Sequence, residues 1–357
     1  MDQENRRLYF FYKFLDQIGL NRVFRYLLSD RPKIVMYHGI IDDSNDIECW
    51  WLIKQSSFVR QIRYIKKNFN VISIDKVYSY ISSNEALPRN TCILSFDDGY
   101  KNYLTKVLPI LRAEQLPSIV YIPSGISASQ GKIWTDRVFY AFYRSSKTFL
   151  DLNDANLGMW RMSSKNDRIK AAHGVINLLK RTPPENKYTL IDLIISKLGI
   201  INESSKAERE NYFAILSIKD IEKLSSDPLV TIGSHSVNHE ILTQLSIKEA
   251  DKEIRRSKGM LEEWINKPVN HFSYPDGKWN STIAELVKKA GYKTATRIGL
   301  GLFRNNQLFQ VPRLAVGFWD NHYSFKSMVN GVTTIKVETE EFLGKLLQSN
   351  RGSNNFA

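Results

Sequence analysis

Leu94-Ser95-Phe96-Asp97-Asp98-Gly99-Tyr100 is the stretch that decides the fold. The apolar run 92–94 predicts a buried parallel strand that ends at the two carboxylates, where a glycine lets the chain turn. Neighbouring side chains of a strand point to opposite faces, but a turn at its end can bring both carboxylates into one cleft. One could then grip a metal while the other holds a proton. On this stretch alone, a strand followed by an ordinary Asp-Gly turn is an equal alternative.

Strand candidates on either side of this stretch alternate with helical patterns. Before and just after it, strands are expected at 33–37, 71–74 and 118–122, with helices at 58–69, from Asp75, and at 103–112. Further along, strands at 229–232, 272–274, 294–296 and 311–314 alternate with helices at 247–265 and 281–290. Such alternation predicts a parallel sheet or barrel of βα units.

The alternation breaks between residues 130 and 226. Helical patterns at 168–180 and 187–198 make this region too long for a loop, so we expect an inserted helical subdomain. The expected organisation is an N-terminal amphipathic helical segment, a barrel in two pieces, the insert, and a C-terminal helix with a disordered tail. These parts are residues 1–32, 33–129 with 227–335, 130–226, and 336–357.

Composition describes a globular protein with a basic excess. The 357 residues are 43% apolar and 24% charged, which is enough to bury a large core. A net charge of +13 favours an anionic partner such as a phosphorylated sugar, nucleic acid or an acidic membrane. No nucleic-acid-binding module is recognisable, so we expect no nucleic-acid partner. The two cysteines, Cys49 and Cys92, argue against a disulfide scaffold and suit a reducing compartment.

The segment 6–28 is aromatic, basic and roughly helical in period. Lys13 and Asp16 interrupt its apolar run, and no small-residue cleavage site follows, so we do not expect a secretory signal. No uncharged apolar stretch reaches the length of about 18 residues that a spanning helix needs. We therefore expect a cytoplasmic protein, with this segment either in peripheral contact with an anionic inner membrane face or packed on its own domain.

A second motif, His235-Ser236-Val237-Asn238-His239, follows the strand at 229–232. Its spacing predicts that both imidazoles lie on one face of a helical turn, close enough to hold one metal ion. Ser236 stands where the zinc-protease motif needs glutamate. With Asp98 the pair would form a two-His-one-carboxylate site with open positions. The common alternative is a pair of solvent-facing histidines on a loop. The position of both motifs at the carboxyl ends of core strands argues against it, because barrel enzymes build their active sites there.

Phe96-Asp97-Asp98-Gly99, His235-Ser-Val-Asn-His239 and Tyr274-Pro275-Asp276-Gly277 together resemble the first three motifs of the polysaccharide deacetylase family, carbohydrate esterase family four, with its NodB-homology domain. The resemblance covers roughly residues 33–125 and 227–316 and is greatest to the exopolysaccharide-deacetylase branches. It implies an α/β fold, a distorted (β/α)₇-type barrel, and metal-dependent removal of an acyl group from an N-acylated sugar.

Carried over by position, the resemblance implies that Asp97 is the general base and that Asp98, His235 and His239 bind a divalent metal. In this family the metal is most often Zn²⁺, with Co²⁺, Ni²⁺ or Mn²⁺ as alternatives. The backbone N–H of Asp276 would help to hold the oxyanion. These residue types suit the chemistry, because a metal polarises the amide carbonyl and a carboxylate takes the proton of water.

The sequence departs from the family pattern at two points. The arginine of the third motif, which orients the base, is replaced by Phe272-Ser273; Arg313 is the candidate substitute, with a structural salt bridge as an equal alternative. The late Leu-x-x-His motif, which supplies the general acid, is missing. His38 resembles the histidine that exopolysaccharide-deacetylase branches supply from the first strand, and it can return a proton near neutral pH. His322, in what looks like an exposed turn, is the competitor.

Four residues are expected to contact substrate: Tyr274 and Pro275 of the third motif, and Trp134 and Asp136 at the start of the insert. Trp134 and Asp136 could equally be a packed aromatic and a helix N-cap. The predicted function is N-deacetylation of an amino sugar in a cell-envelope glycan or its lipid-linked precursor, with the insert helping to choose substrate. The alternatives are a deformylase or O-deacetylase on the same scaffold, or a catalytically inactive carbohydrate-binding protein.

Overall fold

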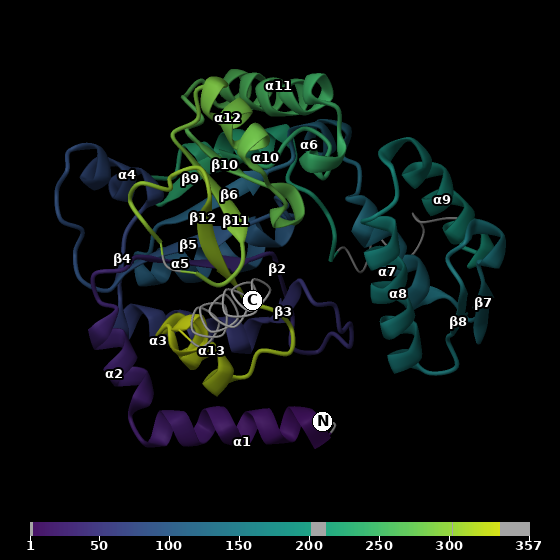
Figure 1. The fold of residues 1–357 in the computed structure, drawn as a ribbon, viewed down its shortest axis with the longest axis horizontal. Helices are drawn as coiled ribbons and strands as arrows, with labels where there is room; N and C mark the ends of the chain where they lie inside the picture. Colours follow the sequence, from purple (N-terminus) through teal and green to yellow (C-terminus); the bar gives the residue numbers. More distant parts are fainter. Residues whose placement is uncertain (1–2, 201–211, 302, 336–357) are drawn as a thin grey trace, which may run out of the picture.

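Seven parallel strands close into a barrel in the computed structural model, which describes residues 3–200, 212–301 and 303–335 (Figure 1). The hydrogen-bonded order is β1-β12-β11-β10-β9-β6-β5, and β5 pairs with β1 to close the ring. The expected (β/α)₇-type barrel is therefore confirmed. Its strands are β1 Lys33–Tyr37, β5 Thr91–Phe96, β6 Ser118–Ile122, β9 Val230–Ser234, β10 His271–Ser273, β11 Thr294–Ile298 and β12 Val311–Ala315.

The register of these strands brings the chemistry-bearing residues to one end of the barrel. β1 and β5 end level with each other, at Tyr37 and Phe96, so His38 and Asp97 follow side by side. β9 ends beside β6, and His235 follows there. Because all the strands are parallel, their carboxyl ends share one end of the barrel.

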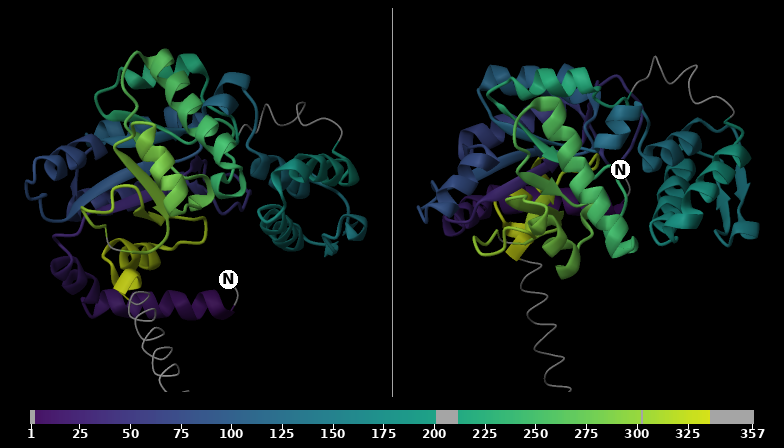
Figure 2. Two further views of the ribbon diagram at one scale, coloured as in Figure 1. Left: turned by 45° about the horizontal axis from the view of Figure 1, so that its top comes forward. Right: turned by 90° about the horizontal axis from the view of Figure 1, so that it is seen from above.

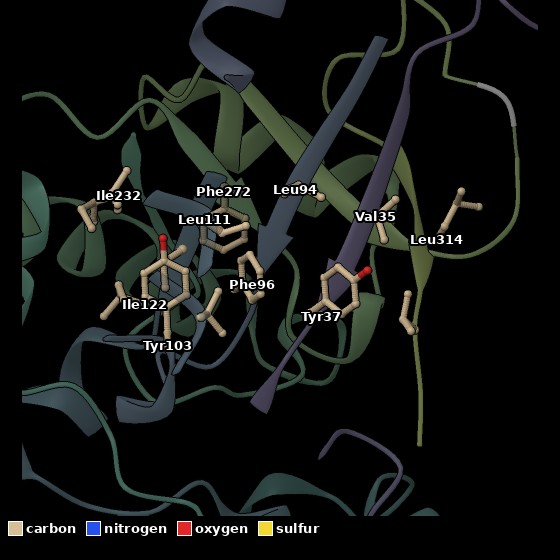
Figure 3. Close-up of a cluster of buried hydrophobic side chains, with 14 of the residues drawn as sticks. Val35, Tyr37, Leu94, Phe96, Tyr103, Leu111, Ile122, Ile232, Phe272 and Leu314 are labelled. Atoms are coloured by element: carbon tan, nitrogen blue, oxygen red, sulfur yellow. The ribbon is translucent and has the colours of Figure 1, made fainter. Parts of the chain in front are cut away.

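Buried apolar side chains fill the barrel and the layer between its strands and helices. Figure 3 shows part of this cluster, in which Tyr37 stacks on Phe96 at 5.4 Å between ring centroids. Every residue of β1, β5 and β6 is buried, as expected for strands covered on both faces.

Helices cover the outside of the barrel. They are α3 Gln55–Asn68, α4 Ile74–Ser82, α5 Leu108–Glu114, α6 Ser124–Ser129, α10 Ile218–Ser225, α11 Ile247–Ile265, α12 Ser281–Lys289 and α13 His322–Val329. A capping box begins α11: the Ser246 side chain accepts a hydrogen bond from the N–H of Glu249, and the Glu249 side chain accepts one from the N–H of Ser246.

Two local expectations are wrong. The strand expected at 71–74 is only β4, Asn70–Val71, because Ser73 caps α4 by accepting a hydrogen bond from the N–H of Lys76. The helix expected at 103–112 begins with a π-helical turn, Tyr103–Val107, before α5. A parallel strand pair that the sequence did not indicate, β2 Gly39–Ile41 and β3 Leu52–Lys54, also lies near the carboxyl end of β1.

The insert forms a separate lobe beside the barrel (Figure 2). Helices α7 Trp134–Arg144, α8 Lys165–Leu179 and α9 Pro184–Lys197 pack around an apolar cluster that also includes Leu52 and Tyr100 of the barrel side. The lobe also holds an antiparallel hairpin, β7 Phe149–Asp151 with β8 Met159–Arg161, which was not predicted. Helix α10 falls within the range 130–226 expected for the insert, but it packs on β9 and α11 of the barrel.

The N-terminal segment is two helices, α1 Gln3–Gln17 and α2 Leu20–Leu27, separated at Gly19 by a left-handed backbone conformation (φ 78°). α1 packs against α13. Within the described part of the chain, no helix has both the length and the apolar character that crossing a membrane requires. The C-terminal helix and disordered tail expected at 336–357 lie outside the described residues.

Candidate active site

The two carboxylates at the end of β5 enter the same cavity. The N–H of Asp97 still donates to the carbonyl of Tyr37 at 2.9 Å, as if the strand continued. Asp98 and Gly99 then take left-handed conformations, with φ of 71° and 62°. This turn cancels the alternation that would have sent the two side chains to opposite faces. Asp97 is 2% exposed and Asp98 5% exposed, and both line one cavity.

The histidine pair converges through an irregular loop, so the expected helical turn is wrong. Ser236 and His239 both adopt left-handed backbone conformations, with φ of 63° and 56°. The loop is held by Glu253 of α11, whose carboxylate accepts hydrogen bonds from the N–H groups of residues 237–238 at 3.0 and 2.9 Å. The ring centroids of His235 and His239 nevertheless lie 4.8 Å apart. Loop geometry brings them together, although the spacing is also that of a helix face.

Asp98, His235 and His239 fit a divalent metal. One ligand atom from each lies within 4.8 Å of the other two. The Nε2 atoms of His235 and His239 are 3.5 and 3.2 Å from Oδ1 of Asp98, which is buried and has no hydrogen-bond partner among the described residues. Nδ1 of His235 lies 2.8 Å from the carbonyl oxygen of Ser273, and donation there leaves the Nε2 lone pair free for a metal. Burial tends to raise the pKa of Asp98, but the two imidazoles hold it well below its usual value, so it is ionised.

Asp97 is held by Arg313 of β12. The guanidinium donates two parallel hydrogen bonds, each of 2.6 Å, to the two carboxylate oxygens. Ser273 bridges the pair, accepting from Arg313 at 2.8 Å and donating to Asp97 at 3.3 Å. Burial tends to raise the pKa of Asp97, but Arg313 and His235 lower it below its usual value. The structure thus places Arg313 on the expected base, although it lies far from the third motif in sequence.

His38 lines the same cavity, whereas His322 does not. The His38 ring makes an edge contact with Trp50 at 5.7 Å, and its buried Nδ1 has no hydrogen-bond partner among the described residues. Burial lowers the pKa of His38, and the attraction of Asp98 and Asp97 offsets this only in part, so the imidazole is neutral at physiological pH. His322 is the exposed first residue of α13.

The residues of the third motif divide between core and cavity. Tyr274 is fully buried and donates its hydroxyl to the carbonyl of Phe309 at 2.8 Å, and Pro275 is buried behind it. Neither lines the cavity, so the expected substrate contact from these two side chains has no support in this geometry. Asp276 does line it, in a left-handed conformation with φ of 55°.

Trp134 faces the cavity, but its expected partner Asp136 does not. The carboxylate of Asp136 is fully buried and accepts hydrogen bonds from the Trp51 indole at 2.8 Å and the Tyr100 hydroxyl at 2.9 Å. Burial and the nearby charge of Asp98 raise its pKa well above the usual value. The N-cap of α7 is Ile133, so Asp136 is neither the cap nor a sugar ligand. It fixes Trp51, which is itself part of the cavity wall.

The cavity lies between barrel and insert and has a volume of about 540 Å³, a size suited to a small ligand or a sugar unit. Motif residues and two tryptophans, Trp50 and Trp51, line its barrel side. The insert contributes Trp134, Thr135, His173, Ile176, Asn177, Lys180 and Arg181. Apart from Trp134, none of these residues of the insert was anticipated as part of the site.

Two lysines of the insert contact the motif loops directly. Lys180, at the end of α8, forms an ion pair with Asp276. Lys187 of α9 is fully buried and pairs with Glu240, the residue that follows His239; its ammonium also lies 5.3 Å from the Trp134 ring centroid. Lys187 shares its helix face with the buried Ile191 and Ile194. A charged residue at this position of an apolar stripe was the one signal that could have indicated it.

Comparison with known proteins agrees with this geometry. Residues 202–295 match the sequence model of the family described as polysaccharide deacetylase. The poly-β-1,6-N-acetyl-D-glucosamine N-deacetylase of Escherichia coli K12 is 25% identical over 349 residues, which cover 88% of this chain and 41% of that protein. The chain therefore spans less than half the length of this relative.

Solved structures share the fold at low identity. The de-N-acetylase of Aggregatibacter actinomycetemcomitans superposes with a TM-score of 0.54 at 15% identity, covering 84% of this chain and all of that one. The deacetylase PplD of Streptococcus pyogenes gives 0.53 at 17%, covering 80% and 92%. IcaB of Ammonifex degensii gives 0.52 at 13%, covering 84% and 97%.

The barrel and the residues at its carboxyl end place the chain in one structural class with these deacetylases. The chain is similar to the polysaccharide deacetylase family over the matched residues 202–295 and shares its fold with solved deacetylases.

Proposed function

We propose that this protein is a metal-dependent N-deacetylase that removes an acetyl group from an amino sugar of a cell-envelope glycan or its lipid-linked precursor. The proposal rests on one observation: two different carboxylate sites line the same cavity. Asp97 is hydrogen-bonded to Arg313, and Asp98 lies beside the imidazoles of His235 and His239. The 25% identity to a poly-N-acetylglucosamine deacetylase supports the choice of an N-acetylated sugar.

Asp98, His235 and His239 would hold the divalent cation, for which the family preference suggests Zn²⁺. When bound, such an ion supplies a Lewis acid that polarises the amide carbonyl and lowers the pKa of water. The ionised Asp98 is already in the protonation state that a metal ligand requires. The same set also suits Co²⁺, Ni²⁺ or Mn²⁺.

Asp97 is the proposed general base. Its lowered pKa keeps it ionised, and the two bonds from Arg313 fix both oxygens, so it can accept a proton from water without reorienting. Arg313 is therefore a positioning residue. Because the pair is almost completely excluded from solvent, the orientation is maintained without competition from water.

His38 is the proposed general acid. The proton that Asp97 takes from water would pass to the neutral imidazole of His38, whose unpartnered Nδ1 can receive it. The resulting imidazolium would give a proton to the leaving amine as the carbon–nitrogen bond breaks. The backbone N–H of Asp276, a residue that lines the same cavity, would stabilise negative charge on the carbonyl oxygen.

The insert would choose the substrate. Trp134, Trp50 and Trp51 offer aromatic surfaces of the kind that sugars stack on, and Lys180 and Arg181 place positive charge on the same wall. A sugar linked to a phosphate would suit this wall, which supports a lipid-linked precursor. The expected cytoplasmic location stays a prediction.

The deciding experiment measures metal content and product together. Purified protein should carry about one divalent ion per chain and release acetate from N-acetylated amino sugars presented as nucleotide-linked, lipid-linked and polymeric substrates. Formate release instead of acetate would favour a deformylase, and acetate from O-acetylated sugars alone would favour an O-deacetylase.

Two variants separate binding of the metal from chemistry. His235→Ala should lose both metal and turnover, whereas Asp97→Asn should keep the metal and lower kcat by at least about 10². Full activity in a preparation shown by elemental analysis to be free of metal would overturn the proposal. Stoichiometric metal with no turnover on any substrate would support the inactive carbohydrate-binding alternative.

A further inference from the structure

The N-terminal helices carry an unusual concentration of exposed apolar side chains. Among the described residues, thirteen large apolar side chains are exposed, and eight of them fall between Leu8 and Leu27. This segment makes up a small fraction of the chain, so random scatter of single surface residues does not account for the cluster.

Helix α1 has an apolar face on each side. Its inner face packs on α13: Tyr9 makes an edge contact with Tyr323 at 5.4 Å, Leu15 is buried, and Asp16 pairs with Lys326 at 2.8 Å. This face alone anchors the helix to the domain.

The outer face of α1 consists of Phe10, Phe11, Phe14 and the following Ile18, which we call the apolar stripe. Their spacing of i, i+1, i+4 and i+8 places them on one side of the helix, and each is at least 50% exposed. In Figure 1, α1 runs along the lower edge of the molecule, with α13 between it and the barrel, so a broad surface can approach it.

Basic residues flank the apolar stripe. Arg6 and Arg7 are exposed at its start, and Arg22 is exposed at the start of α2. α2 adds the exposed Val23, Tyr26 and Leu27. The only acidic residue between 6 and 29, Asp16, is directed to Lys326 on the inner face. Between residues 6 and 29, the outer surface therefore combines apolar side chains with positive charge.

We propose that the apolar stripe binds an anionic lipid bilayer, with α1 lying in the plane of the interface. Apolar side chains of an interfacial helix enter the boundary of headgroups and acyl chains, while arginines pair with anionic headgroups. A second copy of the chain is a poorer occupant, since a twofold contact through this face would bring the arginines of both copies together. The docking is independent of the proposed catalytic activity.

Co-sedimentation of the full chain with vesicles tests the proposal. Vesicles of phosphatidylcholine mixed with an equal amount of phosphatidylglycerol should bind the protein at least about tenfold more tightly than phosphatidylcholine alone, and binding should weaken as salt rises. The double variant Phe10→Ser/Phe14→Ser should lower binding at least about tenfold while the circular dichroism spectrum is unchanged.

Ile247→Ser is the matched control, because Ile247 is 63% exposed at the start of α11, away from α1; it should bind as the parent does. Equal binding by the parent and the double variant would overturn the proposal. So would absence of vesicle binding together with a dimer, seen by analytical ultracentrifugation, that the double variant abolishes, because the face would then be a contact between copies.

Discussion

The barrel and the insert line the same cavity, but they hold their side chains in different ways. On the barrel side, His38, Asp97 and His235 each follow directly on a buried strand, so the register of a closed sheet fixes their positions. On the insert side, the contacts come from the start of α7, from one face of α8 and from single ion pairs to the motif loops.

This difference suits the different tasks that we propose for the two regions. Proton transfer and metal binding need groups held within a fraction of an ångström, which strand ends can provide. Selection of substrate tolerates looser placement and benefits from a wall that can vary without disturbing the barrel. Changes on the barrel side should therefore act on kcat, and changes on the insert side should act on KM or on stability.

The largest effect is expected at His38. His38→Ala should lower kcat by roughly 10²–10⁴ with metal content unchanged, because the leaving amine loses its proton donor. His322→Ala, an exposed histidine on α13, is the control and should leave kcat unchanged. Steady-state kinetics on both variants decides the assignment, and the reverse ranking would show that His38 is not the acid.

Substitutions of Arg313 test whether kcat depends on the orientation of Asp97 or only on the positive charge beside it. Arg313→Lys keeps the positive charge but cannot make the two parallel bonds, so kcat should fall about 10- to 100-fold with KM little changed. Arg313→Met leaves Asp97 buried without its partner and should lower the free energy of unfolding by about 3–5 kcal/mol. Kinetics and denaturant titration measure the two effects; wild-type kcat in the lysine variant would make the pair structural only.

Substitution of Lys187 tests whether the insert stabilises the loop that carries His235 and His239, which we call the metal loop. Lys187→Met leaves Glu240, next to His239, without its buried partner and should lower stability by about 3 kcal/mol or metal affinity by about tenfold. Lys197→Met is the matched control on α9, since its pair with Asp154 is exposed to solvent and should contribute little to stability. Equal effects of the two variants in denaturant and metal titrations would separate the insert from the metal loop.

The smallest effect is expected at Lys180, on the cavity wall. Lys180→Met should raise KM about three- to tenfold and leave kcat within a factor of about two, because it removes binding that ground state and transition state share. The same variant frees Asp276 from its ion pair. A fall in kcat at unchanged KM would instead show that Lys180 acts on the chemical step, as the barrel residues are expected to do.

Much of the barrel and its motif residues could be predicted because both depend on local pattern. Short apolar runs separated by helical stripes indicated all seven barrel strands, and Asp97-Asp98 and His235–His239 stood at the ends of two of them. Errors arose where a local hydrogen bond overrides the pattern. Ser73 turns an apolar strand-like run into the start of α4, and left-handed residues in the loop of His239 replace the helical turn that its spacing suggested.

The sequence by itself determined the alternation of strands and helices, the motif residues and the excess of positive charge, because each depends on residue type and short spacing. Only the tertiary structure decided that Arg313 contacts Asp97, that Asp136 lies behind Trp51, and that two lysines of the insert reach the motif loops. These contacts join residues between 53 and 216 positions apart. Which distant side chains meet depends on barrel closure and on the docking of the insert, and no local pattern encodes either.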